Sequence, residues 1–389
     1  MVGRRRRLWL PPTRLRSAET EREERHATWF ELFFDLVFVV AVGQLSSMLA
    51  ADASAGGFVR FVALFVPVWW AWVVYVTYAD RFDTDDPFYR VLVMLGMLAA
   101  VAMAVSLPRA LDAAWAAAAP FAVAYVGVRL VPLGLYVRAG ASVAVGRELA
   151  WAYATVTLPA AGLWLAGLAV PLPWRYAVWA LAATLELANP FLRRRVVART
   201  PVAVSHLAER FGGFTIIVLG EAVLSVGTTL GATTWQLATA LLAGAAFCVV
   251  AAQWWLYFDF MDAQPLRRGF IRREAFIYGH LPLVVGITAL AAGTKIALAE
   301  AAGGATALGV GAVWAICGGA ASYEVSTGLI HAARHTWRDW LVWERGLAAA
   351  LLLGLGVLGP HLAPLGLFGA LVAIHLGQVV AEVLWHAEV

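Results

Sequence analysis

Charged residues and cysteines are scarce in this sequence. Only 14% of the 389 residues are charged, whereas a soluble domain carries about 25%. The two cysteines, Cys248 and Cys317, fall within apolar runs and predict no disulfide framework. There is no C-x-x-C pair, phosphate-binding loop or dinucleotide fingerprint. We therefore expect no metal, no cofactor, no nucleic-acid partner and no enzymatic activity.

Apolar residues dominate instead and make up 62% of the chain. Runs of about 20 apolar residues recur from residue 28 onward, each long enough for a membrane-spanning helix. The alternating segments of about ten residues that a transmembrane barrel needs are absent. The sequence thus predicts an all-α, polytopic helical membrane protein with the lipid bilayer as a partner. Twelve spans are expected, at approximately 29–50, 57–79, 88–107, 113–136, 148–170, 174–192, 211–231, 234–258, 274–298, 305–331, 341–358 and 361–386.

Short loops join these spans, so we expect one bundle without a soluble module. The predicted organisation is a basic cytoplasmic tail, a first six-helix half, a basic connector with an interfacial helix and a second six-helix half. The boundaries are 1–27, 28–192, 193–210 and 211–389. The tail either sets orientation alone or also binds anionic lipid headgroups.

The distribution of arginine and lysine predicts the orientation. With the N-terminus inside, 24 basic residues fall in inner segments, and four fall outside, namely Arg60, Arg109, Arg175 and Lys295. Cytoplasmic loops of membrane proteins carry such an excess. We expect a multi-pass membrane protein with both termini in the cytoplasm. The sequence gives no oligomeric state.

A weak internal repeat relates the two halves. Both contain Y-x-D-x-x-D at the end of an expected span, beginning at Tyr78 and at Tyr257. Gly43-Gln44 corresponds to Gly220-Glu221 further upstream. Because each half has an even number of spans, we expect parallel repeats, as in some transporters. Chance resemblance among apolar helices is the alternative.

Two motifs make the chain resemble a known family. They are WFELFFDLVFVVAVGQLS at residues 29–46 and SHLAERFGGFTIIVLGEAVLSV at residues 205–226. With YGHLPLVVGI at residues 278–287, they resemble the bacterial low-temperature-requirement A family from about residue 26 to about residue 385. The resemblance implies a multi-pass protein of the bacterial inner membrane and no particular mechanism. The matching positions are Glu31, Phe33, Phe34, Asp35, His206, Glu209, Arg210, Phe211, Gly220, Glu221 and His280.

Acidic residues inside the expected spans are the first candidates for function, because charges are costly in a bilayer. Glu31 and Asp35 are spaced i,i+4 and share one helix face. They serve either as transport residues or as members of a structural ion-pair network with an arginine or histidine. Glu221 falls near the expected midplane, so it is the strongest candidate for a proton or cation site. Its alternative role is an interhelical hydrogen bond in which the glutamate is neutral and structural.

Other buried ionisable groups have less certain roles. Glu186 is a further transport candidate near the inner side. His280 is either a proton relay or an internally satisfied core residue. Arg129 keeps its charge and requires a buried carboxylate, for which Glu324 and Asp35 are the expected partners.

The acidic turn at residues 80–86 has two interpretations. Asp80, Asp83, Asp85 and Asp86 supply oxygen ligands of the kind that divalent cations prefer. EF-hand spacing is missing, however, so a solvated turn that caps the next helix is favoured.

Three functions remain open from sequence. The favoured one is a secondary transporter, with proton coupling as one option, whose inner cavity is lined by carboxylates and which moves an unknown small solute or a proton. The second is a membrane scaffold or stress-tolerance protein whose buried acids are structural. The weakest is an intramembrane enzyme acting on a lipid, because no nucleophile–base pair stands out.

Overall fold

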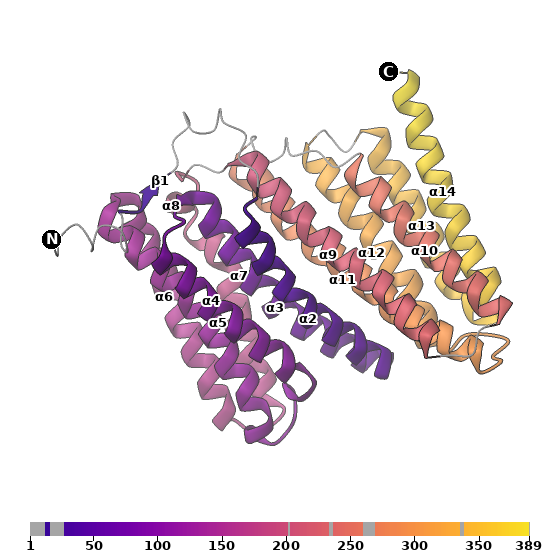
Figure 1. The fold of residues 1–389 in the computed structure, drawn as a ribbon, viewed down its shortest axis with the longest axis horizontal. Coiled ribbons are helices and arrows are strands. Elements are labelled where there is room, and N and C mark those ends of the chain that lie inside the picture. Colours follow the sequence, from indigo (N-terminus) through magenta and orange to yellow (C-terminus); the bar gives the residue numbers. More distant parts are fainter. Residues whose placement is uncertain are drawn as a thin grey trace. The chain divides into compact units, whose positions relative to one another are not determined.

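The computed structural model describes residues 12–15, 27–200, 203–232, 236–259, 269–334 and 338–388. Almost all of these residues are helical (Figure 1). The prediction of a polytopic all-α protein is confirmed. Most of the expected tail lies outside the described residues. Its described part includes strand β1 (Arg14–Leu15), which pairs antiparallel with strand β2 (Phe82–Asp83).

The chain divides into two compact units. Unit 1 comprises the described parts of Met1–Gln44 and Ala63–Arg210, and unit 2 those of Leu45–Val62 and Phe211–Val389. Three helices contribute to both units: α2 (Trp29–Ala51), α3 (Ala55–Arg81) and α9 (Val204–Gly231). Unit 1 also contains α4 (Pro87–Ser106), 3-10 helix η2 (Leu107–Arg109), α5 (Trp115–Ser142), α6 (Ala144–Ala166), η3 (Gly167–Ala169), α7 (Trp174–Leu192) and α8 (Arg194–Val197). Unit 2 contains α10 (Leu237–Phe258), α11 (Phe270–Ala302), α12 (Val310–Arg334), α13 (Trp340–Leu358), η5 (Gly359–His361) and α14 (Pro364–Glu388).

Among the described residues, ten helices are long and apolar enough to cross a membrane. Each of the twelve expected spans has a helix in the structure, but α7 and α12 are not among these ten. Both carry buried polar side chains, including Glu186 and Asn189 in α7 and Glu324 and Ser326 in α12. These polar groups lower the hydropathy of helices whose polar faces are covered by neighbours.

The start of α9 differs from the sequence prediction. Residues 193–210 were expected to form a connector with an interfacial helix, followed by a span at 211–231. The structure instead has only the four-residue α8 in the described part of this stretch before α9 begins at Val204. The polar residues His206 and Arg210 are therefore part of the long helix, where both are buried.

Aromatic side chains hold together the helices of unit 1. Helix α5 packs against α4 and α6, and α6 packs against α7. The rings of Tyr125, Trp164 and Trp179, from α5, α6 and α7, form a continuous group, with centroids 4.7 Å and 5.0 Å apart. The indole N–H of Trp179 donates to the Trp164 carbonyl at 2.9 Å. These contacts combine ring packing with a hydrogen bond from the Trp179 indole.

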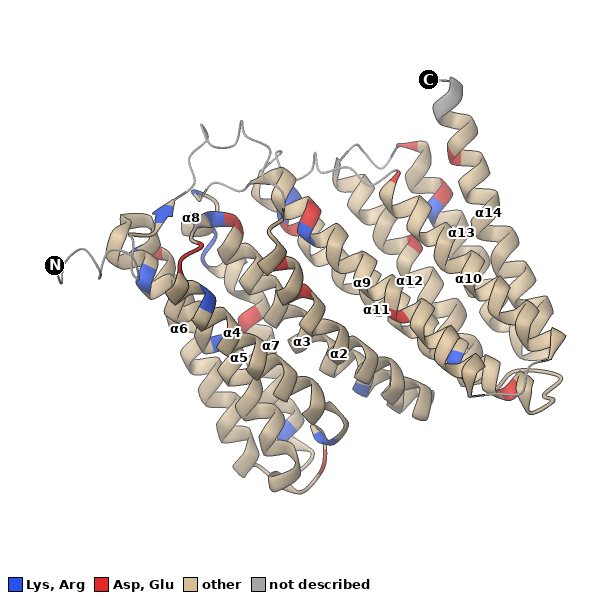
Figure 2. Cartoon of the chain, in the orientation of Figure 1, with Lys and Arg blue, Asp and Glu red and all other residues tan. Residues whose placement is uncertain are grey.

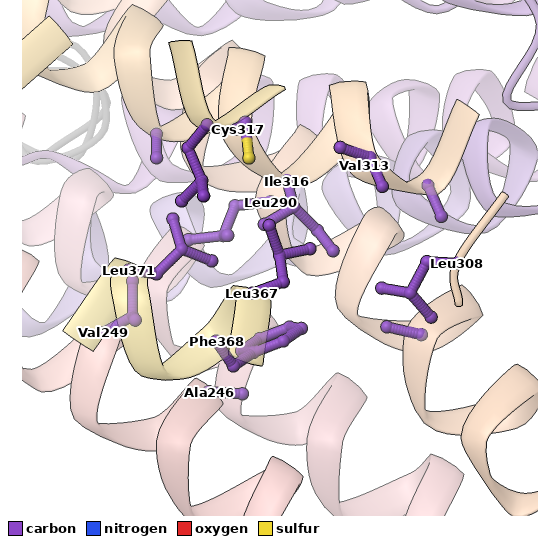
Figure 3. Packing of buried hydrophobic residues seen from close by; sticks show 14 of the residues in the cluster. Ala246, Val249, Leu290, Leu308, Val313, Ile316, Cys317, Leu367, Phe368 and Leu371 are labelled. Carbon is purple, nitrogen blue, oxygen red and sulfur yellow. The ribbon is translucent and has the colours of Figure 1, made fainter. Parts of the chain in front are cut away.

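In unit 2, helices α10 to α14 pack as a closed ring. Each neighbouring pair is in contact, and α14 returns to α10. Leu290, Ile316 and Phe368 belong to the apolar cluster inside the ring (Figure 3), to which all five helices contribute. Helices α11 and α12 approach closely because Gly286 and Gly319 face each other. A Cβ on either glycine would lie 2.5 Å from the other's carbonyl oxygen. Small residues permit such close helix approach in membranes.

Many large apolar side chains point outward. Leu98, Val105, Leu347 and Val357 are each more than 60% exposed. Charged residues are sparse along the helices (Figure 2). An apolar exterior around polar interior contacts is the arrangement that a lipid environment requires.

Candidate functional site

The first turn of α2 fixes the position of Glu31. The Thr28 hydroxyl accepts a hydrogen bond from the Glu31 amide at 3.2 Å. In return, Glu31 Oε2 accepts from the Thr28 amide at 2.8 Å and from its hydroxyl at 3.0 Å. This reciprocal pair is a capping box, which the sequence encodes as Thr-x-x-Glu. The other carboxylate oxygen of Glu31, Oε1, faces residues of α9.

Asp35 lies one turn further along α2 and is fully buried. Arg210 of α9 binds it through two hydrogen bonds, from Nε to Oδ2 at 3.0 Å and from Nη2 to Oδ1 at 2.5 Å. Trp72 of α3 donates its indole N–H to Oδ1 at 2.7 Å. A buried carboxylate requires both a charge partner and hydrogen bonds, and Asp35 has both. Its geometry is that of a structural ion pair.

His206 lies one turn before Arg210 on α9 and is also fully buried. Its Nε2 is 3.2 Å from Glu31 Oε1, and its Nδ1 is 3.3 Å from Asp80 Oδ1. The second oxygen of Asp80 accepts from the Ala203 amide at 3.2 Å. His206 therefore joins a carboxylate of α2 to a carboxylate of α3. We call Glu31, Asp35, Asp80, His206 and Arg210 the α2–α3–α9 cluster.

The two contacts of His206 require one proton more than a neutral ring between two ionised carboxylates supplies. A neutral imidazole donates from one nitrogen only and carries a lone pair on the other. Carboxylate oxygens face both nitrogens, so with both acids ionised one contact would set a lone pair against an anion. One further proton, either on the ring or on a carboxylate, turns both contacts into hydrogen bonds.

The balance of charges in the cluster also favours one added proton at His206. Glu31, Asp35 and Asp80 supply three negative charges, and Arg210 supplies one positive charge. Arg81, the neighbour of Asp80 in the chain, is buried and donates to the hydroxyls of Tyr136 at 2.9 Å and Tyr153 at 2.8 Å. With both arginines counted, the group is neutral when His206 is protonated and carries one net negative charge when it is not.

Two small hollows adjoin Glu31. One is lined by Glu31, Arg210 and the rings of Phe30, Phe34, Tyr75 and Tyr89, together with Ala79 and Val93. The other is lined by Thr28, Phe30, Glu31, Ala79, Phe82, Thr84, Asp85 and Tyr89. Each has a volume of about 10 Å³, which is close to the space that one water molecule needs. Of the cluster, Glu31 is thus the residue that borders both hollows.

Comparison with known proteins places this architecture in a family. The sequence model of the family described as bacterial low temperature requirement A protein (LtrA) matches residues 26–380 of this chain. This chain belongs to the LtrA family. It is also 30% identical over 310 residues to an uncharacterized protein of Rhizobium meliloti (strain 1021), covering 74% of this chain and 72% of that protein. The chain is therefore a multi-pass membrane protein of the LtrA family.

In this LtrA-family protein, Glu221 is found in unit 2. Its Oε1 lies 3.4 Å from Nζ of Lys295 and accepts from the Ser225 hydroxyl at 3.2 Å. Lys295, the single lysine of the sequence, also donates to the Ser47 hydroxyl at 3.4 Å. Glu221 thus has an interhelical partner on α11, and that partner is a cation, whereas the alternative interpretation expected a neutral glutamate.

The expected partners of Arg129 are wrong. Arg129 Nε donates to Glu186 Oε1 at 2.7 Å, and Tyr125 donates to the other oxygen of Glu186. Arg129 and Glu186 are both buried. Helices α5 and α7, which carry Arg129 and Glu186, both pack against α6. The expected partners Asp35 and Glu324 pair with Arg210 and Arg345 instead. Glu186, expected as a transport residue, sits in a paired environment.

Glu324 pairs with Arg345 of α13 instead, at 3.2 Å from Nη1 to Oε2. Both ring nitrogens of His280 have neutral hydrogen-bond partners. Its Nδ1 faces the Phe276 carbonyl at 2.7 Å, and its Nε2 faces the Tyr257 hydroxyl at 2.9 Å. A neutral imidazole makes both bonds, since it donates from Nδ1 and accepts at Nε2. This geometry fits the core role of His280 better than the relay role.

The acidic turn separates into different environments. Asp80 is buried against His206, whereas Asp85 binds Arg90 at the surface. Asp86 caps α4 by accepting from the Tyr89 amide at 3.1 Å, as the capping interpretation expected. The side chain of Asp83 lies outside the described residues, as does Asp262 of the repeat. No group suited to a metal occurs in the described ranges.

Sequence reasoning missed His206, Arg210 and Asp80 as members of the site. His206 and Arg210 matched family positions but were assigned to a connector. His206 and Arg210 are spaced i,i+4, as are Glu31 and Asp35, so each pair lies on one face of its helix. The matching spacing of two basic and two acidic residues was a signal that these two faces contact each other. The Thr-x-x-Glu signature at Thr28 was also available, and it marks the true start of α2.

Proposed function

We propose that this LtrA-family protein is a proton-coupled secondary transporter of the bacterial inner membrane, with both termini cytoplasmic. Glu31, His206 and Asp80 form its proton site, and an unidentified small solute is its cargo. One observation carries the proposal: both ring nitrogens of the buried His206 face carboxylates, an arrangement that binds a proton.

The chemistry of the site suits proton coupling. Histidine is the side chain whose ordinary pKa lies closest to neutral pH, and ionisable groups within spans commonly mark proton or substrate pathways. The hollows at Glu31 have space for a water molecule beside one carboxylate of the site. A proton then reaches His206 through Glu31, while Asp35 stays bound to Arg210.

The internal repeat expected from the sequence favours the transporter class. The sets α2–α7 and α9–α14 each contain six helices. Each set ends in a helix whose buried glutamate pairs with a buried arginine, Glu186 with Arg129 and Glu382 with Arg345. Many secondary transporters are built from such repeats.

A second candidate is the non-transporting scaffold, and one observation favours it. Asp35, Glu186, Glu221 and Glu324 each have a cationic partner in the structure. Paired acids of this kind hold helices together and move no solute. The two candidates differ at His206, because a scaffold has no use for an exchangeable proton there.

Proton movement in reconstituted vesicles tests the proposal. The full chain is incorporated into proteoliposomes that contain a pH-sensitive dye, and a potassium diffusion potential, negative inside, drives proton entry. Amino acids, sugars, carboxylic acids and monovalent cations are then added in turn outside. We expect at least one class to accelerate acidification, and we expect His206→Gln to abolish that acceleration.

His280→Gln is the matched control, because His280 is equally buried but carries no carboxylate partner. Solute-dependent proton entry in the wild type and in His280→Gln, but not in His206→Gln, supports the proposal. If all folded variants equal protein-free vesicles for every class, the scaffold function is favoured instead.

A further inference from the structure

A second buried histidine faces a carboxylate in unit 2. His375 of α14 and Glu324 of α12 both have 0% exposed side chains. Nε2 of His375 lies 3.7 Å from Oε1 of Glu324. Neither of these two atoms has a hydrogen-bond partner within the described part of the chain. Two buried polar atoms that face each other in this way require an explanation.

The other nitrogen of His375 fixes the tautomer. Nδ1 lies 2.9 Å from the Leu371 carbonyl oxygen, which only accepts hydrogen bonds. Nδ1 therefore carries a hydrogen. In a neutral ring, Nε2 then presents a lone pair to Glu324 Oε1. The contact becomes favourable when one proton is added, either at Nε2 or at Oε1.

The charges around this pair also favour an added proton. Arg345 is the cation of the group, and Glu324, Glu344 and Glu382 all contact it. Gln378 donates to Glu324 Oε2 at 3.0 Å, on the oxygen that also faces Arg345. One arginine balances one carboxylate, so the group carries excess negative charge until protons bind. Tyr323 of α12 is a further titratable group beside Glu324, Arg345 and Glu382.

We propose that Glu324 and His375 form a second proton-binding site, which holds one exchangeable proton between Oε1 and Nε2. The proton binds as H⁺ and leaves as H⁺, with no change of oxidation state. This inference does not depend on solute transport, since the pair binds its proton whether or not a solute moves. Each unit of the protein then contains one histidine–carboxylate proton site.

Nitrogen NMR tests the proposal directly. The full chain, labelled with ¹⁵N-histidine, is placed in lipid nanodiscs and titrated over the range in which it stays folded. The histidine ring signals report which nitrogens carry hydrogen, and the His375→Gln variant assigns the signal of His375. Infrared difference spectra of the wild type report in parallel a protonated carboxyl, which Glu324→Gln removes.

We expect the added proton to be present at neutral pH, either as a doubly protonated His375 or as a protonated Glu324, and to be lost at high pH. In Glu324→Gln the amide donates permanently to Nε2, so His375 stays neutral throughout. His280 is the internal control, and its ring remains neutral because Tyr257 donates to it.

A neutral His375 with no protonated carboxyl at any pH would overturn the proposal. If His375→Gln does not fold, the ring signal that changes in Glu324→Gln assigns His375, so that both possible positions of the proton are still measured. These measurements need no transport activity. The spectra therefore test the Glu324–His375 site and the vesicle experiment tests transport, and one proposal can be wrong while the other holds.

Discussion

Arg210 donates two hydrogen bonds to Asp35, from Nε to Oδ2 at 3.0 Å and from Nη2 to Oδ1 at 2.5 Å. Both side chains are buried, at 2% and 0% exposure. The pair joins the first turns of α9 to the first turns of α2.

Removal of the arginine should destabilise the protein strongly. Arg210→Met leaves the Asp35 carboxylate buried with Trp72 as its remaining donor. A stranded buried charge costs about 3–5 kcal/mol, and we expect a loss of that size in the free energy of unfolding, measured by chemical denaturation in detergent micelles. The double variant Arg210→Met, Asp35→Leu should recover most of the loss, since it strands no charge.

Arg90 provides the matched control. It binds Asp85 through the same two-bond geometry, at 2.7 Å and 2.7 Å, but both side chains are about half exposed. Exposed pairs contribute about 0–1 kcal/mol, so Arg90→Met should have little effect. Equal losses at Arg90 and Arg210 would show that burial does not set the cost of losing either partner.

The two roles of Glu31 can be separated by substitution. Thr28→Ala removes one half of the capping box and should cost about 1 kcal/mol of stability. It leaves the Glu31 carboxylate beside His206, so proton entry in vesicles should persist. Glu31→Gln keeps a side chain that serves in a capping box but removes the charge that faces His206. It should therefore retain most stability and reduce proton entry.

Chemical denaturation measures the stability of both variants, and the vesicle assay measures their proton entry. A Thr28→Ser variant should match the wild type in both measurements. Loss of proton entry in Thr28→Ala, with retained folding, would contradict the assignment of the proton role to the Glu31 carboxylate.

Arg129 and Glu186 should behave as a structural pair. Arg129→Gln leaves Glu186 with Tyr125 as its donor, and we expect a loss of about 3–5 kcal/mol together with poor expression. The swapped variant Arg129→Glu, Glu186→Arg should restore expression, measured as folded protein recovered from membranes. Swaps of Arg129 with Glu324 or Asp35 should fail, because those acids belong to other pairs.

Tyr257 and His280 should matter for stability and not for proton movement. Tyr257→Phe removes the donor to Nε2 of the buried His280. An unsatisfied buried acceptor costs about 1–3 kcal/mol, which thermal denaturation would detect. Proton entry should equal that of the wild type in folded protein. A selective loss of proton entry would revive the relay role of His280.

The sequence by itself determined the membrane class, the twelve long helices and the family. Those features follow from local composition, because a run of apolar residues needs no knowledge of its neighbours to require lipid. It also identified Glu31, Asp35, Arg129 and Glu324 as buried charges that needed partners, since an isolated charge is costly in an apolar environment.

Only the tertiary structure decided which partner each charge has. Arg129 and Glu186 are 57 residues apart, and Arg210 and Asp35 are 175 residues apart. Spacing along one helix shows which residues share a face, but it does not show which face of another helix lies opposite. For the same reason, His206 looked like part of a polar connector until its two nitrogens were found between Glu31 and Asp80. The energy required to bury a charge can be judged from the neighbouring residues of the same helix. The oppositely charged partner that stabilises it comes from a distant part of the chain.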